Sequence, residues 1–146
     1  MKSQHKKLVA QVDKLHSIYI RLRDKRRFGG MCAICGKRPI AHCFHFLSRG
    51  NLATRWEDDN TCGSCAGCNF RESMDRKEAT KDYFRSIHVQ LVGEPRRQEL
   101  EHQARQIAKY SCPDLEAIKA QIESKILNVC GEDVKCRKVV RQEPIL

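Results

Sequence analysis

Apolar positions near the start of the chain follow the spacing of an amphipathic helix. They recur at alternating steps of four and three residues and form one stripe, which consists of Leu8, Val12, Leu15, Tyr19 and Leu22. Gly29 and Gly30 follow Phe28 and end the pattern. We therefore predict a helix over residues 4–27. Its stripe can pack on a protein core or pair with a second copy of the chain in a homodimer.

The rest of the pattern predicts a small strand-containing region followed by helices. Residues 31–60 lack helical spacing and contain glycine, proline and short alternating pieces, which favour a hairpin or two short strands with a long loop. Helical spacing returns from about Ser64. The expected fold class is α+β, with a small core between N-terminal and C-terminal α-helices. Its segments are a basic amphipathic N-terminal helix (1–29), the core (30–93), a C-terminal helical arm (94–130) and a polar, poorly ordered tail (131–146).

The composition adds a polyanionic partner to this picture. The 28 Lys and Arg residues outnumber the 18 Asp and Glu residues, which gives a net charge of +10. Nucleic acid is the first candidate for such a partner, although a basic protein can also be merely soluble. Aromatic residues make up only 6% of the chain, so we expect a small hydrophobic core and a further source of stability.

The nine cysteines can supply that stability. The first residues, MKSQHKKLVAQVDK, lack the apolar segment of a signal peptide, and no apolar run reaches the length of a membrane span. We therefore expect a cytoplasmic protein without a membrane partner. Clustered cysteines in that reducing environment bind metal more often than they form disulfides. Cys112 and Cys130 are isolated, and we expect them to be small buried apolar side chains.

Two Cys-x2-Cys motifs, CAIC and CAGC, predict a tetrahedral zinc site with four sulfur ligands. The expected ligands are Cys32, Cys35, Cys65 and Cys68. Four protein ligands leave no open position for chemistry, so the role of this zinc is structural. Cys62 and Cys65 have the same spacing and form an alternative second pair. We prefer Cys65 with Cys68, because residues three apart at the start of a helix lie on one face.

A histidine and two asparagines are spaced along the same region as in an HNH nuclease, whose ββα-metal fold joins two strands and a helix around a divalent ion. His45 would end the first strand and act as general base, since an imidazole titrates near neutral pH. Asn60 would orient His45 or contact the ion, and Asn69 would complete the site from the helix. The ion, Mg²⁺ or Mn²⁺, would stabilise the charge that develops on the phosphate. His45 can instead be a structural or zinc-binding histidine.

Several motifs also occur in the order and spacing of a known family: YIRLRD, CAICG, HFLSRG, TRWEDDN, CAGCN, DYFRSIHVQLVGE and DLEAIKAQIESKI. Through them the chain resembles the phage NinG/Rap recombination family over residues 15–128. The relatives are HNH-type proteins implicated in phage recombination, acting on branched DNA. The resemblance implies that residues 30–93 form a zinc-bound ββα-metal core in which His45, Asn60 and Asn69 are the three HNH positions.

The chain departs from this family beside His45. Cys62 stands two residues after Asn60, where a histidine is expected, and a thiolate suits zinc better than magnesium. Phe44 precedes His45, where other HNH enzymes carry an acidic or histidine ligand. His42 can substitute for that ligand if the loop folds back. Cys62 and His42 are therefore candidate ligands of a second, open metal site.

The favoured function is a metal-dependent, structure-specific endonuclease that hydrolyses phosphodiester bonds in branched DNA recombination intermediates such as a Holliday junction. A phage-encoded chain would act in the host cytoplasm. The first alternative is a non-catalytic, zinc-dependent DNA-binding accessory protein, and the second is a protein-interaction adaptor. The DNA contacts are expected from the RLRDKRR segment and from two arginines that the resemblance places at the phosphate backbone, and the residues are Arg21, Arg23, Lys25, Arg26, Arg27, Arg49 and Arg55.

Overall fold

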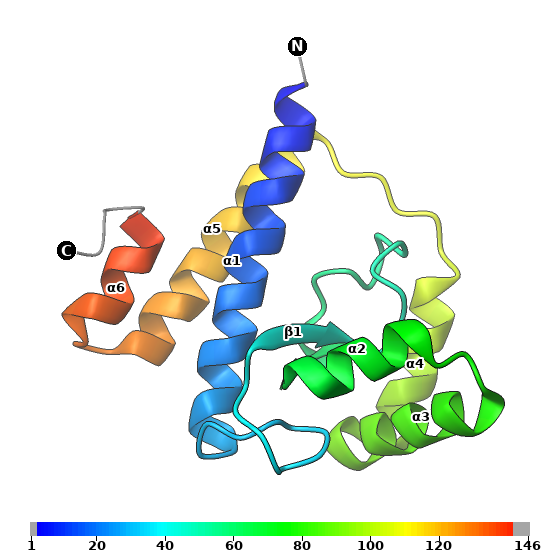
Figure 1. The fold of residues 1–146 in the computed structure, drawn as a ribbon. Helices are drawn as coiled ribbons and strands as arrows, with labels where there is room; N and C mark the ends of the chain where they lie inside the picture. Colours follow the sequence, from blue (N-terminus) through cyan, green and yellow to red (C-terminus); the bar gives the residue numbers. More distant parts are fainter. Residues whose placement is uncertain (1–2, 142–146) are drawn as a thin grey trace.

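Helices make up most of the molecule, and the residues that this computed structural model describes, 3–141, contain one small sheet (Figure 1). In chain order the elements are α1 (Gln4–Arg27), β1 (His42–His45), the 3₁₀ helix η1 (Asp58–Asn60), β2 (Thr61–Ser64), α2 (Ala66–Met74), α3 (Glu78–Val92), α4 (Glu94–Ala104), α5 (Cys112–Cys130) and α6 (Val134–Arg141). The fold is therefore α+β, as predicted from the sequence. Strand β1 and the long connection lie within residues 31–60, where short strands and a long loop were predicted, whereas β2 lies directly after that range.

The apolar stripe of α1 packs against α5, which runs beside it in the same direction (Figure 1). Val12 and Leu15 form one buried cluster with Ile122 and Ile126 of α5. The helix has the predicted bounds, and Phe28 caps its C-terminus. The stripe is thus buried within the chain, so it is part of the core and does not offer a free surface to a second copy.

A second buried face of α1 packs against the sheet. It carries His16, Ile20 and Asp24, and the carboxylate of Asp24 is fully buried. Asp24 Oδ2 accepts a hydrogen bond of 2.7 Å from the backbone N–H of Gly63 in β2. The stripe pattern did not predict this face, because two of its three side chains are polar. Helix α1 therefore lies between α5 on one side and the strands on the other.

The antiparallel pairing of β1 with β2 divides their side chains between two faces. Phe44 is opposite Cys62 and His45 is opposite Thr61. Phe44 and Cys62 point to a buried cluster that includes Phe84 of α3, whose ring stacks on that of Phe44 at 5.2 Å. His45 and Thr61 belong to the face that packs on α1. Side chains alternate across a strand, so neighbouring residues of each strand contact different parts of the molecule: one the apolar cluster and the next helix α1.

The long connection between β1 and β2 is held by polar side chains from the surrounding helices. His88 of α3 is fully buried and its Nε2–H donates to the carbonyl oxygen of Asp59 at 2.6 Å. Arg97 of α4 donates to His88 Nδ1 at 2.8 Å, and Lys125 of α5 forms an ion pair of 2.9 Å with Asp58. These contacts give the loop a fixed shape: His88 holds a backbone carbonyl and Lys125 a carboxylate of the loop, while Arg97 holds His88 in place.

The C-terminal part differs from the prediction in two respects. Residues 134–141, expected to be part of a poorly ordered tail, form α6, while residues 142–146 lie outside the described residues. Cys130 is buried, as expected, but it is disulfide-bonded to Cys136 because the turn after α5 brings the two Cα atoms to 5.4 Å. None of the helices in the described part of the chain combines the length and the apolarity needed to cross a membrane.

Candidate metal centre and the adjoining cavity

Four cysteine sulfurs converge where the segment after α1 meets the start of α2. The Sγ atoms of Cys32, Cys35, Cys65 and Cys68 all lie within 4.8 Å of one another. Within residues 3–141, this is the one group of three or more His, Cys, Asp or Glu side chains arranged so closely. Cys62 is not a member of this group and lies opposite Phe44 in the sheet. The geometry therefore agrees with the preferred pairing of Cys65 with Cys68.

The backbone around these sulfurs is arranged as in a metal-binding turn. The backbone N–H of Cys68 donates to Cys65 Sγ and that of Ile34 donates to Cys32 Sγ, both at 3.4 Å. Burial raises the pKa of the Cys35 thiol, but hydrogen bonds from Lys37 N–H and the neighbouring thiols outweigh it and lower the pKa to about 7. Four thiolates fit zinc, and such a closed set can hold a metal for structure but leaves no position for substrate.

A cavity of about 470 Å³ lies next to this centre, between α1 and α2 over the end of β1. Its lining includes His16 from α1, His45 from β1 and Asn69 with Glu72 from α2. Cys68 and Asn69 are neighbours in sequence, so one turn of α2 serves both the sulfur centre and the cavity. The structure thus brings together two of the three residues predicted as catalytic, His45 and Asn69.

The ring of His45 has a defined orientation and tautomer. Its Nε2 lies 3.0 Å from the carbonyl oxygen of Arg55. A carbonyl can only accept a hydrogen bond, so Nε2 carries the proton and Nδ1 keeps its lone pair. Burial lowers the pKa of His45 below its ordinary value of 6.5. The imidazole is therefore neutral at physiological pH, with an unprotonated nitrogen available as a base.

Asn60 is not positioned to bind a metal ion. Its side chain is fully buried. Its Oδ1 accepts from Leu47 N–H at 2.8 Å, and its Nδ2 donates to the carbonyl oxygens of Leu47 and Thr54 at 3.2 and 3.0 Å. The amide thereby fixes the loop that carries the Arg55 carbonyl. Of its two predicted roles, this arrangement agrees with orienting His45 and leaves no free atom to contact an ion.

Comparison with known proteins adds no relative at this point: no family model, no curated protein and no solved structure matches the chain.

Cys62 and His42, the predicted ligands of a second site, do not reach the cavity. Cys62 is 1% exposed and belongs to the opposite face of the sheet from His45. His42 is exposed at the far end of β1, and two residues of the strand separate it from His45. Glu72, two turns into α2, is the acidic residue that lines the cavity from the helix. One spacing in the sequence indicates its position: Glu72 follows Asn69 by three residues, so both lie on one helix face.

The predicted DNA-contacting arginines fall into two groups. Arg55 and Arg49 both bind Asp13 of α1, with N–O distances of 2.6 and 2.7 Å, and Arg55 is largely buried while Arg49 is 59% exposed. Arg23 is 15% exposed and pairs with the buried Asp24 at 2.7 Å. Arg23 and Arg55 therefore hold the fold together, because their charge is already matched by a carboxylate.

The exposed cations lie at the end of α1. Lys25, Arg26 and Arg27 form its last turn, and all three are exposed. Arg27 makes only a long contact of 3.5 Å with Asp24, and Arg21 donates to the carbonyl oxygen of Ser17. These side chains remain available to a polyanion.

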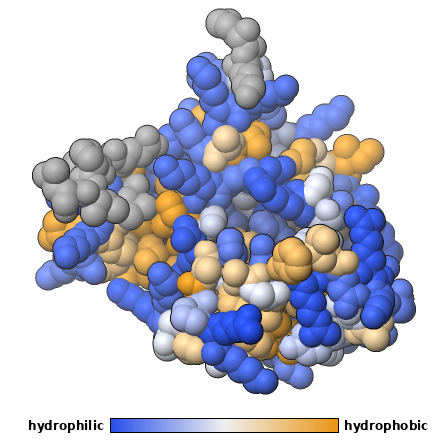
Figure 2. Space-filling view, in the orientation of Figure 1, coloured by the Kyte–Doolittle hydropathy of each residue, from blue (hydrophilic) through white to orange (hydrophobic). Residues whose placement is uncertain are grey.

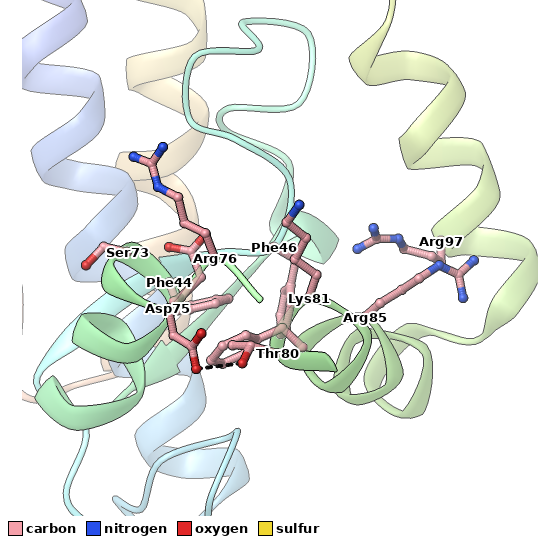
Figure 3. A pocket seen from close by; sticks show the side chains of 11 residues that line it. Phe44, Phe46, Ser73, Asp75, Arg76, Thr80, Lys81, Arg85 and Arg97 are labelled. Atoms are coloured by element: carbon pink, nitrogen blue, oxygen red, sulfur yellow. Dashed lines mark hydrogen bonds between the residues drawn. The ribbon is translucent and has the colours of Figure 1, made fainter. Parts of the chain in front are cut away.

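A second cavity, of about 420 Å³, shares Glu72 with the first. Figure 3 shows the side chains around it, with Arg85 and Arg97 together on one side and Arg76 and Lys81 apart from them. Arg85 and Arg97 each bind carboxylates of α4, whereas Arg76 and Lys81 are exposed. The positive side chains around the two cavities thus differ in how far their charge is already matched.

Proposed function

We propose that this protein is a metal-dependent endonuclease that hydrolyses phosphodiester bonds in branched DNA. The proposal rests on the orientation and the tautomer of the His45 ring. Its Nε2–H is held by the Arg55 carbonyl at 3.0 Å, and the lone pair of Nδ1 is left beside a cavity of about 470 Å³. That volume lies in the range of small-ligand sites, which is about 300–1,000 Å³.

The arrangement of elements around His45 supports a ββα-metal domain of the HNH type. Two antiparallel strands precede a helix, His45 ends the first strand, Asn60 directly precedes the second and Asn69 lies on the helix. The four-cysteine centre joins the segment before the strands to the start of that helix. The same residues carry the resemblance to the phage NinG/Rap recombination family, from which the preference for branched DNA is drawn.

The chemistry that follows is an in-line displacement at phosphorus. His45 Nδ1 accepts a proton from a water molecule as its oxygen bonds to phosphorus, and the bond from phosphorus to the 3′ oxygen breaks. The leaving 3′ oxygen takes a proton from solvent, so the products are a 5′-phosphate and a 3′-hydroxyl. Asn69 and Glu72 would hold a divalent ion, whose chemistry is to stabilise the negative charge on the phosphate and the leaving oxygen.

Glu72 is suited to such a role because its charge is not matched by the protein. It is exposed at the cavity, and within residues 3–141 it forms no ion pair with Lys, Arg or His. Asn69 stands three residues earlier on the same helix, so the two oxygen ligands share one face. Carboxylate and amide oxygens are the ligands that Mg²⁺ and Mn²⁺ prefer.

The charge distribution supports a nucleic-acid substrate. The chain carries a net charge of +10, and the last turn of α1 exposes three cations in succession. The second cavity adds Arg76, which forms no ion pair within residues 3–141; Lys81 beside it forms an exposed pair of 3.6 Å with Glu78. Cations that are free of carboxylate partners bind phosphates by releasing counterions, so affinity should fall steeply with salt.

The decisive experiment is cleavage of a synthetic four-way junction with Mg²⁺ or Mn²⁺, using zinc-loaded protein. His45→Ala should slow cleavage by about 10²- to 10⁴-fold, the usual contribution of a general base, while zinc content and junction binding persist. His42→Ala is the matched control, because His42 lies on the same strand but outside the cavity. Equal cleavage by wild type and His45→Ala would refute the role of His45.

A non-catalytic DNA-binding module is the second candidate, and one observation favours it. Among the described residues, the four cysteines are the one closely packed group of metal-binding side chains, so the cavity has no closed cation site. This candidate predicts junction binding without cleavage by any variant under any metal. It would be preferred if linear duplex, flaps and four-way junctions all stayed intact with each ion.

A further inference from the structure

Helix α2 exposes two large apolar side chains on its outer face. Phe70 and Met74, four residues apart, are 65% and 66% exposed, and no residue between Ala66 and Met74 is buried. Of the five phenylalanines in the chain, Phe70 is the one that is exposed. The helix crosses the front of the molecule in Figure 1, so this face is open to a large partner. Single exposed apolar residues are ordinary on protein surfaces, so the surroundings decide whether this pair has a role.

The first of these surroundings is an arginine that lies against α2. Gly67 shares the helix face of Phe70 and Met74, because the three positions follow the i, i+3, i+7 spacing. A Cβ atom at Gly67 would lie 2.7 Å from Nη1 of Arg38, so the absence of a side chain there lets the Arg38 guanidinium approach the helix closely. Arg38 is exposed and forms no ion pair within residues 3–141. Its charge is therefore available beside the apolar pair.

The second is Arg71, which lies between the two apolar side chains in sequence. Its guanidinium lies over the ring of Tyr83, 5.0 Å from the centroid, and it has no carboxylate partner among the described residues. Glu72, the acidic residue of α2, is two positions from both Phe70 and Met74, so it lies on the opposite side of the helix and lines the cavities. The outer face thus offers apolar surface beside unmatched positive charge, and a partner that fits it must offer apolar surface beside negative charge.

We propose that Phe70 and Met74 insert between the bases at the branch point of a DNA junction, while Arg38 and Arg71 bind neighbouring phosphates. This inference rests on the proposed function and names the feature of branched DNA that the protein recognises. Bases offer apolar faces next to phosphates, and the net charge of +10 favours such a polyanion over an apolar protein surface. Inserting an apolar side chain unstacks bases, and the cost is least where stacking is already broken. Insertion therefore favours a branch point over a linear duplex.

The position of the pair on α2 also predicts where the DNA is cut. Phe70 directly follows Asn69, which lines the His45 cavity, and Met74 directly follows Ser73, which lines the second cavity. A branch point held at Phe70 would therefore lie beside the His45 cavity. Cleavage should fall within a few nucleotides of the branch point.

The first measurement uses only the zinc-loaded, full-length wild type, so it does not depend on how a variant folds. The probe is a four-way junction that carries 2-aminopurine, an adenine analogue whose fluorescence rises when it is unstacked. We expect the fluorescence to rise on binding when the analogue is at the branch point, and to stay constant when it is in the middle of an arm. Unchanged fluorescence at the branch point of the bound junction would overturn the inference.

The second measurement compares affinities for the junction and for a linear duplex of the same sequence. Phe70→Ala/Met74→Ala should lose about 10-fold in junction affinity, roughly the effect of removing one contact between an aromatic ring and a base, and keep its duplex affinity. Phe70→Trp keeps an aromatic face and should bind the junction as wild type does. Ile107→Ala is the matched control, because Ile107 is 91% exposed and lies after α4. Zinc content and unfolding curves should match those of wild type, since the substituted side chains are exposed.

The outcomes separate this inference from the proposed function. A preference for the junction that depends on Phe70, in a protein that cleaves no DNA, would uphold the insertion and refute the nuclease. Junction binding and cleavage by Phe70→Ala/Met74→Ala at wild-type levels would overturn the insertion and leave the nuclease intact. Equal losses on junction and duplex would also overturn it. So would a wild-type dimer that the double variant abolishes, because a second copy of the chain would then cover this face.

Discussion

The four-cysteine centre and the His45 cavity share helix α2 but are assembled in different ways. The centre takes its ligands from two short motifs, each of which brings two sulfurs together within four residues. The cavity takes its side chains from α1, β1, the following loop and α2. One site is therefore set by local turns, and the other by how distant elements pack. It follows that the four-cysteine centre can form with few other contacts, whereas the cavity exists only in the complete fold.

The dependence between the two regions runs in one direction. The cavity needs α2 in its place against β1, and the sulfurs fix the start of α2 to the segment before β1. The metal centre needs none of the cavity residues. Helix α2 buries little apolar surface, since its Phe70 and Met74 are 65% and 66% exposed, and Figure 2 shows apolar patches among the polar residues of this side of the molecule. A metal ion bound by the four cysteines would then contribute much of the free energy that holds α2 in place.

Removal of the metal should have the largest effect of any single change. Structural zinc contributes about 10–16 kcal/mol in small zinc-binding domains, while a whole domain is stable by only about 5–15 kcal/mol. Cys68→Ser, or chelation of the wild type, should therefore abolish the amide-exchange protection of β1, β2 and α2. Hydrogen exchange with mass spectrometry measures this directly.

Cys62→Ser is the control for that experiment. Cys62 is as deeply buried as Cys65 and lies three residues from it, but it is not among the converging sulfurs. The variant should keep one zinc per chain and lose only about 1–3 kcal/mol for a buried hydroxyl. A chain that kept zinc with Cys68→Ser and lost it with Cys62→Ser would reverse the assignment.

Loss of the Asn60 hydrogen bonds should loosen the loop between β1 and β2 and disturb the cavity, but leave the four-cysteine centre intact. Asn60→Ala removes three hydrogen bonds, two to the backbone of Leu47 and one to the carbonyl oxygen of Thr54. At about 1 kcal/mol for each, the free energy of unfolding should fall by about 3 kcal/mol, with zinc content unchanged. Urea denaturation measures the loss, and Mn²⁺ affinity reports on the cavity. Asn51→Ala in the same loop should stay within about 0.5 kcal/mol of wild type.

Acid should act through the buried histidines before it affects most carboxylates. Burial lowers the pKa of His16 from 6.5 to about 3 and that of His88 from 6.5 to about 4. Below pH 6.5 the unfolded chain takes up protons that the folded chain refuses, so stability falls as pH falls toward these lower values. Each histidine should contribute up to about 1.4 kcal/mol per pH unit.

The measurement is urea unfolding from about pH 7 to 5, with the bound zinc assayed at each point. His16→Gln should lower the dependence on pH by the contribution of one histidine. Identical slopes for the variant and wild type, at equal zinc content, would show that His16 is protonated in the folded protein as readily as in the unfolded chain.

The sequence predicted the features that depend on short spacing and missed those that depend on packing. The helix over residues 4–27 and the four sulfur ligands follow from periodicity and from paired motifs. His16 was missed because a histidine inside a helix gives no signal until the sheet that covers it is known. Cys62 was predicted as a ligand beside His45 because it follows Asn60 by two residues, where the resemblance expects a histidine, but the strand register turns it to the opposite face.

The sequence also could not distinguish the cations of the RLRDKRR segment from one another, because all of them look alike in sequence. The structure separates Arg23, matched by the buried Asp24, from Lys25 and Arg26, which are exposed and form no ion pair within residues 3–141. A distinction of this kind comes from the position of each side chain around the helix and from the carboxylate it meets.

The smallest predicted effect is on DNA binding, and it tests whether the exposed cations at the end of α1 contact the phosphates. The double variant Lys25→Ala/Arg26→Ala should weaken binding to a four-way junction by about 1 kcal/mol and reduce the slope of log affinity against log salt by about 2, because each lost phosphate contact removes about 0.9 from that slope. Its unfolding curve should match that of wild type, since neither side chain is buried. Arg105→Ala/Lys109→Ala removes the same charge from the segment at the end of α4 and beyond. Equal slopes for these two variants would mean that binding depends on net charge alone, whereas a smaller slope only for the α1 variant would place the phosphates at the end of α1.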